Sequence, residues 1–310
     1  MARPGVSGEQ WALVLAGGDG RRLQELTQAI TGAPIPKQYC RIVGERSLLE
    51  STLLRTRHLV PHDRTMVIVN DNHLEMARDQ LSTLPAQSLL VQPRNRDTGP
   101  GLLFSLLHLA RRAEQATVAV FPSDHYVGDE RRFVEHVQQA TRIVEEVPDK
   151  IVLLGIPPDR AERGYGYVEP AQPLGDIGGA GAFHVAGFLE KPSLARARSI
   201  LARGGLWNSF VMVFRLPRML ELMRQVLPEE FEAMRALPPE PVAAAAQYRD
   251  LRSWNFSTEF LARIPEHLVV LRVENVHWSD WGTPQAIERT FRHLKLRPPW
   301  RARKWSPAAA

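Results

Sequence analysis

The segment Leu15–Leu23 (LAGGDGRRL) places glycines and arginines directly after an apolar run. Glycine can adopt positive φ and lets backbone N–H groups approach an anion closely. Arg21 and Arg22 add permanent charge and forked donors that match phosphate oxygens. Leu23 replaces the third glycine of a Rossmann fingerprint, and the Gly-Lys-Ser/Thr of a Walker loop does not follow. The segment predicts triphosphate binding, although a glycine turn with solvated arginines would have the same sequence.

Three other segments carry polar groups that could share a crevice with this loop. Pro34–Gln38 supplies a lysine in a loop stiffened by prolines, and Gln92–Thr98 is dense in groups able to read a base edge. Phe121–His125 (FPSDH) places a carboxylate at the tip of an expected strand. Because ligands of open parallel sheets gather at such tips, we expect these segments to meet in one site.

Strands and helices of alternating type must position these loops. Buried strands are expected at Trp11–Ala16, Thr65–Asn70, Ser88–Val91, Thr117–Phe121 and Lys150–Gly155. Helices are expected at Ser47–Leu59, Asn72–Leu84, Gly101–Glu114 and Arg131–Glu146. Strands separated by helices of this length indicate right-handed βαβ crossovers and a parallel sheet covered on both faces. The first half of the chain is therefore predicted to be α/β.

The second half is less regular. Strands are expected at Gly164–Val168, His184–Leu189 and Val211–Arg215, and helices at Ser193–Arg203, Pro217–Val226 and Pro284–Lys295. Leu237–Ala246 predicts a proline-rich linker that leads into a helix. Residues 296–310 are basic and broken by proline, which predicts a flexible, solvated tail. The alternative for this tail is a membrane-interface contact of Trp300 and Trp305.

Composition narrows the classes of function. The 310 residues carry 39 Lys and Arg against 34 Asp and Glu, a net charge of +5, which is too weak an excess to predict nucleic-acid binding. The single cysteine, Cys40, excludes a disulfide framework or a cysteine-built zinc site within one chain. The sequence has no signal peptide and no apolar run of the ~18 residues that a membrane span needs. We expect a cytoplasmic protein, with homo-oligomerisation left open.

Seven motifs follow one another along the chain. They are GxGxRL (Gly18, Gly20, Arg22, Leu23), PKQ (Pro36–Gln38), PSDH (Pro122–His125), ERGYGYVEP (Glu162–Pro170), FLEKP (Phe188–Pro192), LWNSF (Leu206–Phe210) and WSDWGTP (Trp278–Pro284). In this order they resemble the sugar-1-phosphate nucleotidyltransferases, most of all the mannose-1-phosphate guanylyltransferase branch. The resemblance implies one nucleotidyltransferase domain at residues 1–295, with a nucleotide-binding half at 10–160 and a sugar-phosphate-binding half at 161–295.

Fold and reaction also follow from the resemblance. It implies a Rossmann-like nucleotidyltransferase fold, with an open, mostly parallel α/β sheet flanked by helices and a mixed sugar-binding half. It implies Mg²⁺-dependent transfer of a nucleotidyl group from an NTP, here GTP, to a sugar 1-phosphate, here mannose 1-phosphate, with release of pyrophosphate. A sugar phosphate is already an oxyanion at neutral pH, so the reaction needs positioning and charge neutralisation rather than a side-chain base.

Residue roles follow from the same resemblance. Nucleotide binding is assigned to Gly17, Gly18 and Gly20 and, for the base or ribose, to Gln92, Asn95, Thr98 and Ser123. Arg22 is assigned to the leaving pyrophosphate, Lys37 to phosphates near the reacting centre and Lys191 to the sugar phosphate. Asp124 and Asp280 are assigned to Mg²⁺, which prefers oxygen ligands, and Gly166, Glu190 and Asn208 to the sugar.

Simpler interpretations stay open at some of these positions. Asp124 could cap a helix, Asp280 could be a turn residue, and Glu190 with Lys191 could form a surface pair. The sequence also departs from the family pattern, most consequentially at Phe210, where glycine normally follows Trp-Asn-Ser. Its ring either narrows the sugar pocket or points into the core. The alternatives in function are a nucleotidyltransferase for another sugar 1-phosphate and a catalytically silent nucleotide-sugar-binding regulatory protein.

Overall fold

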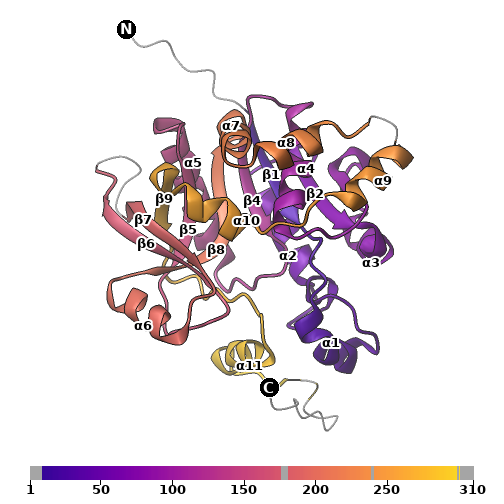
Figure 1. Cartoon of the computed structure of the whole chain (residues 1–310). Helices are drawn as coiled ribbons and strands as arrows, with labels where there is room; N and C mark the ends of the chain where they lie inside the picture. The colour runs from indigo at the N-terminus through magenta and orange to yellow at the C-terminus, as the bar shows by residue number, and fades with distance from the viewer. Residues whose placement is uncertain (1–8, 176–180, 239–240, 299, 301–310) are drawn as a thin grey trace.

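The computed structural model describes residues 9–175, 181–238, 241–298 and 300. Within these residues, nine strands form a single sheet with helices packed against it (Figure 1). The strands are β1 (Gln10–Leu15), β2 (Thr65–Asn70), β3 (Leu89–Gln92), β4 (Thr117–Pro122), β5 (Ile151–Ile156), β6 (Gly166–Pro173), β7 (Ala182–Glu190), β8 (Leu206–Arg215) and β9 (Leu268–Arg272). Their order is β3-β2-β1-β4-β8-β5-β9-β7-β6, so the sheet runs through both predicted halves of the chain.

Helices connect the strands, as the spacing of the apolar runs predicts. They are α1 (Gln24–Thr31), α2 (Leu48–Arg57), α3 (Leu74–Arg78), α4 (Thr98–Ala110), α5 (Glu130–Glu146), α6 (Leu194–Ala202), α7 (Leu216–Val226), α8 (Pro228–Arg235), α9 (Pro241–Asp250), α10 (Phe256–Glu259) and α11 (Pro284–His293). α9 is the helix expected after the linker, whereas α1, α8 and α10 are not anticipated by the sequence patterns.

Alternation along the strands sorts the core into two layers. Ala12 and Val14 of β1 belong to the cluster that packs against α2 and α5. Trp11 and Leu13, which point to the opposite face, belong to the cluster that packs against α4 and α7. Helices therefore cover both faces of the sheet, which is why the central strands are almost wholly apolar.

The pairing of the strands confirms only part of the predicted sheet. β1 pairs in parallel with β2 and β4, and β2 with β3, as expected. The expectation that β5 joins the same parallel set is wrong, because β8 lies antiparallel between β4 and β5, while β5 pairs in parallel with the unpredicted β9. β6 also pairs with β8, so β8, β5, β9, β7 and β6 close into a barrel-like ring. The sheet is therefore mixed, not open and mostly parallel.

The length of β8 explains this difference. Its ten residues pair with β4, β5 and β6, whereas the sequence predicts only the end Val211–Arg215 as a strand. Asn208 and Ser209 interrupt the apolar run, yet both are buried. The Ser209 hydroxyl donates to the carbonyl of Leu154 (2.6 Å), so the polar residue is satisfied inside the sheet.

A third apolar cluster lies beneath the loops of the site. Leu23, Leu26, Trp281 and Phe291 pack there with Trp300, whose ring meets Phe291 edge-on at 5.0 Å. Trp300 is only 1% exposed, so the expectation of a solvated tail is wrong for this residue. Residues 299 and 301–310 of that tail, including Trp305, lie outside the described residues. Among the helices described, none combines the length and apolar character that crossing a bilayer demands.

Candidate functional site

A cleft of about 700 Å³ lies where the tips of β1, β3 and β4 face the barrel-like ring. Most of the residues singled out from the sequence line it, namely Gly17, Gly18, Arg22, Gln92, Asn95, Thr98, Ser123, Asp124, Gly166, Glu190, Lys191, Asn208 and Asp280. Gly20 and Lys37 lie outside this lining. The fold thus brings segments from both halves of the chain to one site.

The glycine loop is held from behind through its carbonyl groups. The amide of Gln38 donates to the carbonyls of Ala16 (3.2 Å) and Gly18 (2.7 Å). The amide of Asn70 donates to the carbonyl of Gly17. Within the described part of the chain, the N–H groups of Gly17 and Gly18 donate to no acceptor. These N–H groups are therefore available to an anion.

Gln92 supports this loop from the next strand tips. A Cβ on Gly17 would lie 2.6 Å from Gln92 Nε2, and one on Gly101 would lie 2.8 Å from Gln92 Oε1, so both positions need glycine. Gln92 Nε2 donates to Asn70, and Gln92 Oε1 accepts from the hydroxyl of Tyr248 (3.2 Å). Both ends of the amide are engaged, which leaves base recognition by Gln92 a prediction.

Gly20 and Ser123 also have backbone roles. Gly20 has a φ of 62°, and a Cβ there would lie 3.1 Å from Cα of Pro36. Glycine at this position therefore lets the two loops meet. The buried Ser123 hydroxyl donates to the carbonyl of Leu15 (2.8 Å) and so fixes the tip of β4 to that of β1.

Lys37 joins the two loops that carry the predicted metal carboxylates. Its buried ammonium lies 3.2 Å from Asp124 Oδ2. It also donates to the carbonyls of Asp280 and Trp281, the latter at 3.2 Å. The three donors of the ammonium are therefore occupied within the chain.

Asp280 is oriented by a tyrosine and by its own turn. Asp280 Oδ1 accepts from the hydroxyl of Tyr165 (2.7 Å) and from the N–H of Gly282 (2.8 Å). Burial raises the pKa of Tyr165, so this phenol stays a donor. A Cβ on Gly282 would clash with Asp280 and would lie 3.1 Å from Arg22 Nη2. The Arg22 guanidinium therefore reaches across the cleft to the Asp280 turn.

Asp124 stands between a lysine and a histidine. Burial alone would raise the pKa of its carboxyl, but Lys37 and His125 outweigh burial and hold that pKa below its usual value. His125 Nε2 lies 3.5 Å from Asp124 Oδ1. Burial is the larger influence on His125 and lowers its pKa, so the imidazole is neutral at pH 7. The pair therefore carries one negative charge facing the cleft.

The donor set fits a hard divalent cation. Asp124 and Asp280 line the same cleft and offer carboxylate oxygens. In the described residues, no group of three or more His, Cys, Asp and Glu side chains could hold a metal ion alone. This arrangement suits Mg²⁺, which is commonly held by one or two carboxylates and completed by water and substrate phosphates.

The opposite wall gathers the residues assigned to the sugar. Gly166 pairs with Glu190 across β6 and β7, and a Cβ on Gly166 would lie 2.6 Å from Glu190 Oε2 and 3.4 Å from Asn208 Cβ. Glu190 Oε1 lies 3.1 Å from Lys191 Nζ. Lys191 has a φ of 46°, an uncommon left-handed backbone that turns the chain at the edge of the cleft.

Phe210 lies at a bulge in β8. Asn208 pairs with Gly155 and Met212 with Leu153, so three residues of β8 face one residue of β5. The φ of Phe210 is 59°, which favours glycine, the residue that the family pattern has here. Its ring both lines the cleft and packs edge-on against Phe256 at 5.9 Å. Each of the two sequence interpretations is thus partly confirmed.

Some lining residues escaped the sequence reasoning, namely Asp19, Arg21, Gln38, Asp97, His125, Tyr165, Ser253, Asn255, Ser257 and Trp278. Tyr165 and Trp278 stand inside quoted motifs, which was the available signal. Asn255 has no such signal, since it reaches the site through its contact with Asp97 (Nδ2 to Oδ1, 3.2 Å). Phe256 N–H likewise donates to Thr98 Oγ1 (3.1 Å), which ties the predicted base-reading loop to the segment before α10.

Comparison with known proteins agrees with this architecture. The chain matches the nucleotidyl transferase family over residues 11–296 and therefore belongs to it. It is 31% identical over 299 residues to a mannose-1-phosphate guanylyltransferase of Escherichia coli K12, covering 91% of this chain and 60% of that protein. It is 36% identical over 219 residues to the xanthan biosynthesis protein XanB of Xanthomonas campestris, covering 70% of this chain and 44% of XanB. The chain thus spans about half the length of these curated relatives.

A solved structure also resembles the fold closely. The crystal structure described as mannose-1-phosphate geranyltransferase from Thermus thermophilus superimposes with a TM-score of 0.78 at 31% identity, covering 91% of this chain and 79% of that chain. The resemblance to sugar-1-phosphate nucleotidyltransferases predicted from the motifs is confirmed at the level of the family.

Proposed function

We propose that the protein transfers a nucleotidyl group from an NTP to a sugar 1-phosphate, releasing pyrophosphate and forming a nucleotide sugar. One observation carries the proposal: a single cleft holds free N–H groups of a glycine loop, Arg22, two carboxylates and a lysine beside a group of hydroxyl-binding side chains. These are the parts that phosphoryl transfer between two phosphate-bearing substrates needs.

The glycine loop and Arg22 would hold the triphosphate. A phosphate oxygen of the sugar 1-phosphate attacks the α-phosphorus, and the bond to the pyrophosphate oxygen breaks. Arg22 would neutralise charge on the leaving pyrophosphate, because its guanidinium reaches toward the Asp280 turn. Since the nucleophile is already an anion, the neutral His125 need not act as a base.

Asp124 and Asp280 would hold Mg²⁺, which would offset the charge of the converging phosphates. Lys37 would keep both aspartate loops in place through its contacts with Asp124 and the Asp280 carbonyl. The relatives give these residues a family precedent, since the family is one in which metal dependence is typical.

We assign the nucleotide to the half formed by residues 10–160 and the sugar phosphate to residues 161–295 within one domain. Asn208 and the carboxylate of Glu190 would bind sugar hydroxyls around Gly166, and Lys191 would bind the sugar phosphate. The names of two relatives favour GTP and mannose 1-phosphate as substrates. Phe210, which lines the cleft, is the feature that would alter the choice of sugar.

The test is to incubate the protein with each NTP, with mannose or glucose 1-phosphate and with Mg²⁺, and to measure pyrophosphate. Release that needs NTP, sugar phosphate and metal together, and that is fastest with GTP and mannose 1-phosphate, supports the proposal. NTP binding without pyrophosphate release from any pair would instead identify a silent nucleotide-sugar-binding protein.

A further inference from the structure

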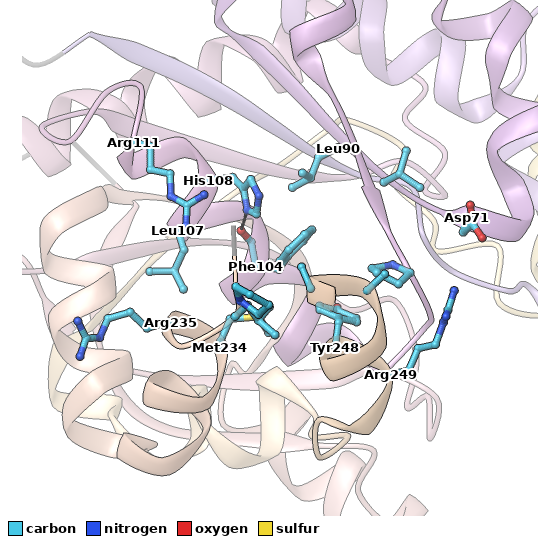
Figure 2. A pocket seen from close by; sticks show the side chains of 16 residues that line it. Asp71, Leu90, Phe104, Leu107, His108, Arg111, Met234, Arg235, Tyr248 and Arg249 are labelled. Atoms are coloured by element: carbon cyan, nitrogen blue, oxygen red, sulfur yellow. Dashed lines mark hydrogen bonds between the residues drawn. The ribbon is translucent and has the colours of Figure 1, made fainter. Parts of the chain in front are cut away.

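A second cavity, of about 590 Å³, lies apart from the catalytic cleft, between β3, α4, α8 and α9 (Figure 2). Its wall is largely apolar, with Leu90, Phe104 and Leu107 on one side and Met234 and Ala245 on the other. Leu90, Phe104 and Leu107 are only partly buried, although they pack beside fully buried core residues. A cavity of this size and character is typical of a small-molecule site.

Aromatic rings shape the floor of this cavity. Phe104 meets Tyr248 edge-on at 5.1 Å and lies 4.3 Å from the ring of His108. His108 Nδ1 contacts the carbonyl of Phe104 at 2.8 Å, which fixes the imidazole on α4. An aromatic or extended apolar body would therefore meet ring faces and edges rather than mobile side chains.

The cavity carries unpaired positive charge. Arg111 and Arg249 line it from α4 and α9 and appear on opposite sides of the view in Figure 2. Within the described residues, neither guanidinium has a carboxylate partner, whereas Arg235 is paired with Glu232 (2.6 Å). Asp71 is an acidic residue in the same lining, so the arginines outnumber it. The chemistry favours a ligand that combines an apolar body with an anionic group.

A chain of buried hydrogen bonds links this cavity to the glycine loop. The hydroxyl of Tyr248, which lines the cavity, donates to Gln92 Oε1 at 3.2 Å. Gln92 Nε2 donates to Asn70 Oδ1, and Asn70 Nδ2 donates to the carbonyl of Gly17. Gly101 of α4 also lies against the Gln92 amide. A ligand that moves Tyr248 would therefore change the position of the loop that holds the nucleotide.

We propose that this cavity is a regulatory site for an amphipathic anion, an apolar or aromatic body bearing a carboxylate, sulfonate or phosphate. Its occupancy alters nucleotide affinity through the chain from Tyr248 to Gly17. The binding half of the inference stands on the cavity alone, whereas the coupling half rests on the proposed function, because it requires a bound nucleotide.

The first experiment tests the site with anilinonaphthalene sulfonate, a fluorescent aromatic sulfonate, in titrations of the folded full chain. We expect saturable binding that Ala245→Phe, which fills the cavity, weakens by at least about tenfold, a loss equivalent to about 1.4 kcal/mol. Ala246→Phe, on the exposed side of the same helix, is the matched control, and circular dichroism checks that each variant folds. Equal dye affinity in wild type and Ala245→Phe overturns the site.

The second experiment tests the charge. Arg111→Gln and Arg249→Gln should each weaken dye binding by about two- to fivefold, the range of an exposed ion pair, whereas Arg224→Gln on α7 should not. Phenylnaphthylamine, the neutral analogue of the dye, should bind alike to all of these proteins. Equal losses for the dye in Arg111→Gln and Arg224→Gln overturn the requirement for an anion.

The third experiment measures the coupling. The dissociation constant of the dye should change by about fivefold or more when GTP is saturating, and the affinity for GTP should change by the same factor with saturating dye. Tyr248→Phe should bind the dye but lose this factor. Binding of GTP with no effect on the dye contradicts the coupling alone. A chain that binds no GTP contradicts both the coupling and the proposed function, while the dye titrations still decide the site.

Discussion

The two carboxylates of the cleft are held in different ways. Asp124 is paired with the buried ammonium of Lys37, whereas Asp280 accepts from the Tyr165 hydroxyl and the Gly282 N–H. Lys37 touches both loops, so it links the two sites before any substrate arrives. With its donors occupied in this way, Lys37 acts on substrate phosphates through the aspartates that it positions. The charge of each aspartate, more than its shape, is what the reaction would use.

Asp124→Asn and Asp280→Asn should therefore each reduce turnover by at least about 100-fold, because asparagine preserves the shape but removes the charge that would hold Mg²⁺. Pyrophosphate release is measured across a range of Mg²⁺ concentrations, together with the thermal unfolding midpoint. Asp149→Asn, at an exposed surface ion pair, is the control. Near-normal Mg²⁺-dependent activity in both cleft variants would refute the metal assignment.

Lys191 and Arg22 stand on opposite walls and should give opposite kinetic phenotypes. Lys191→Ala should raise the KM for the sugar phosphate and lower kcat, while Arg22→Ala should chiefly impair use of the triphosphate. Loss of one such cation costs about 2 to 4 kcal/mol of transition-state stabilisation. Steady-state kinetics with each substrate varied in turn distinguish the two. A reversal of the phenotypes would contradict the division into a nucleotide half and a sugar half.

At the scale of elements, the bulge in β8 sets the shape of the sugar wall. It leaves Phe210 with a left-handed backbone and turns Asn208 so that its Oδ1 accepts from the Phe210 N–H (3.1 Å). The ring of Phe210 packs on Phe256 and thereby connects the sugar wall to α10. The backbone strain and the ring packing oppose each other, so they must be separated by two substitutions.

Phe210→Ala removes the ring but keeps the Cβ, whereas Phe210→Gly removes both. We expect the glycine variant to be more stable than the alanine variant by about 1 kcal/mol, since glycine adopts positive φ without a steric penalty. We also expect both to change the ratio of kcat/KM for mannose and glucose 1-phosphates, because the ring lines the cleft. Denaturant unfolding and paired kinetics measure these effects. An unchanged sugar ratio would place the ring solely in the core.

The elements at the parallel end of the sheet could be predicted because burial on both faces produces continuous apolar runs such as TMVIVN in β2. The placement of β8 between β4 and β5 could not, because periodicity reports which face is buried but not which strand is the neighbour. The same holds in the site. The glycine loop and the aspartates carry a local signal, whereas the contact of Tyr165 with Asp280 joins residues 115 apart in the sequence. Such pairs are products of the tertiary fold.

At the scale of the whole molecule, the cleft is formed where two differently built parts of one sheet meet. The parallel strands supply the glycine loop and Asp124, and the barrel-like ring supplies Gly166, Glu190 and Asn208. The cluster beneath the loops joins these parts from below, because it contains Leu23, which follows Arg22, and Trp281, which follows Asp280. The integrity of this cluster should therefore affect catalysis as well as stability.

Trp300 tests that link, because its buried ring completes the cluster from beyond α11. Trp300→Ala should lower the free energy of unfolding by about 3 to 5 kcal/mol, the cost of removing a buried aromatic ring. It should also raise the KM for the triphosphate, since Leu23 and Trp281 lose their shared packing partner and the loops bearing Arg22 and Asp280 become less well positioned. Leu296→Ala, which changes a side chain that is 51% exposed, is the control and should alter neither quantity appreciably. Denaturant unfolding and kinetics below the unfolding transition measure the two effects. Loss of stability with an unchanged KM would show that the cluster supports the fold without positioning the site.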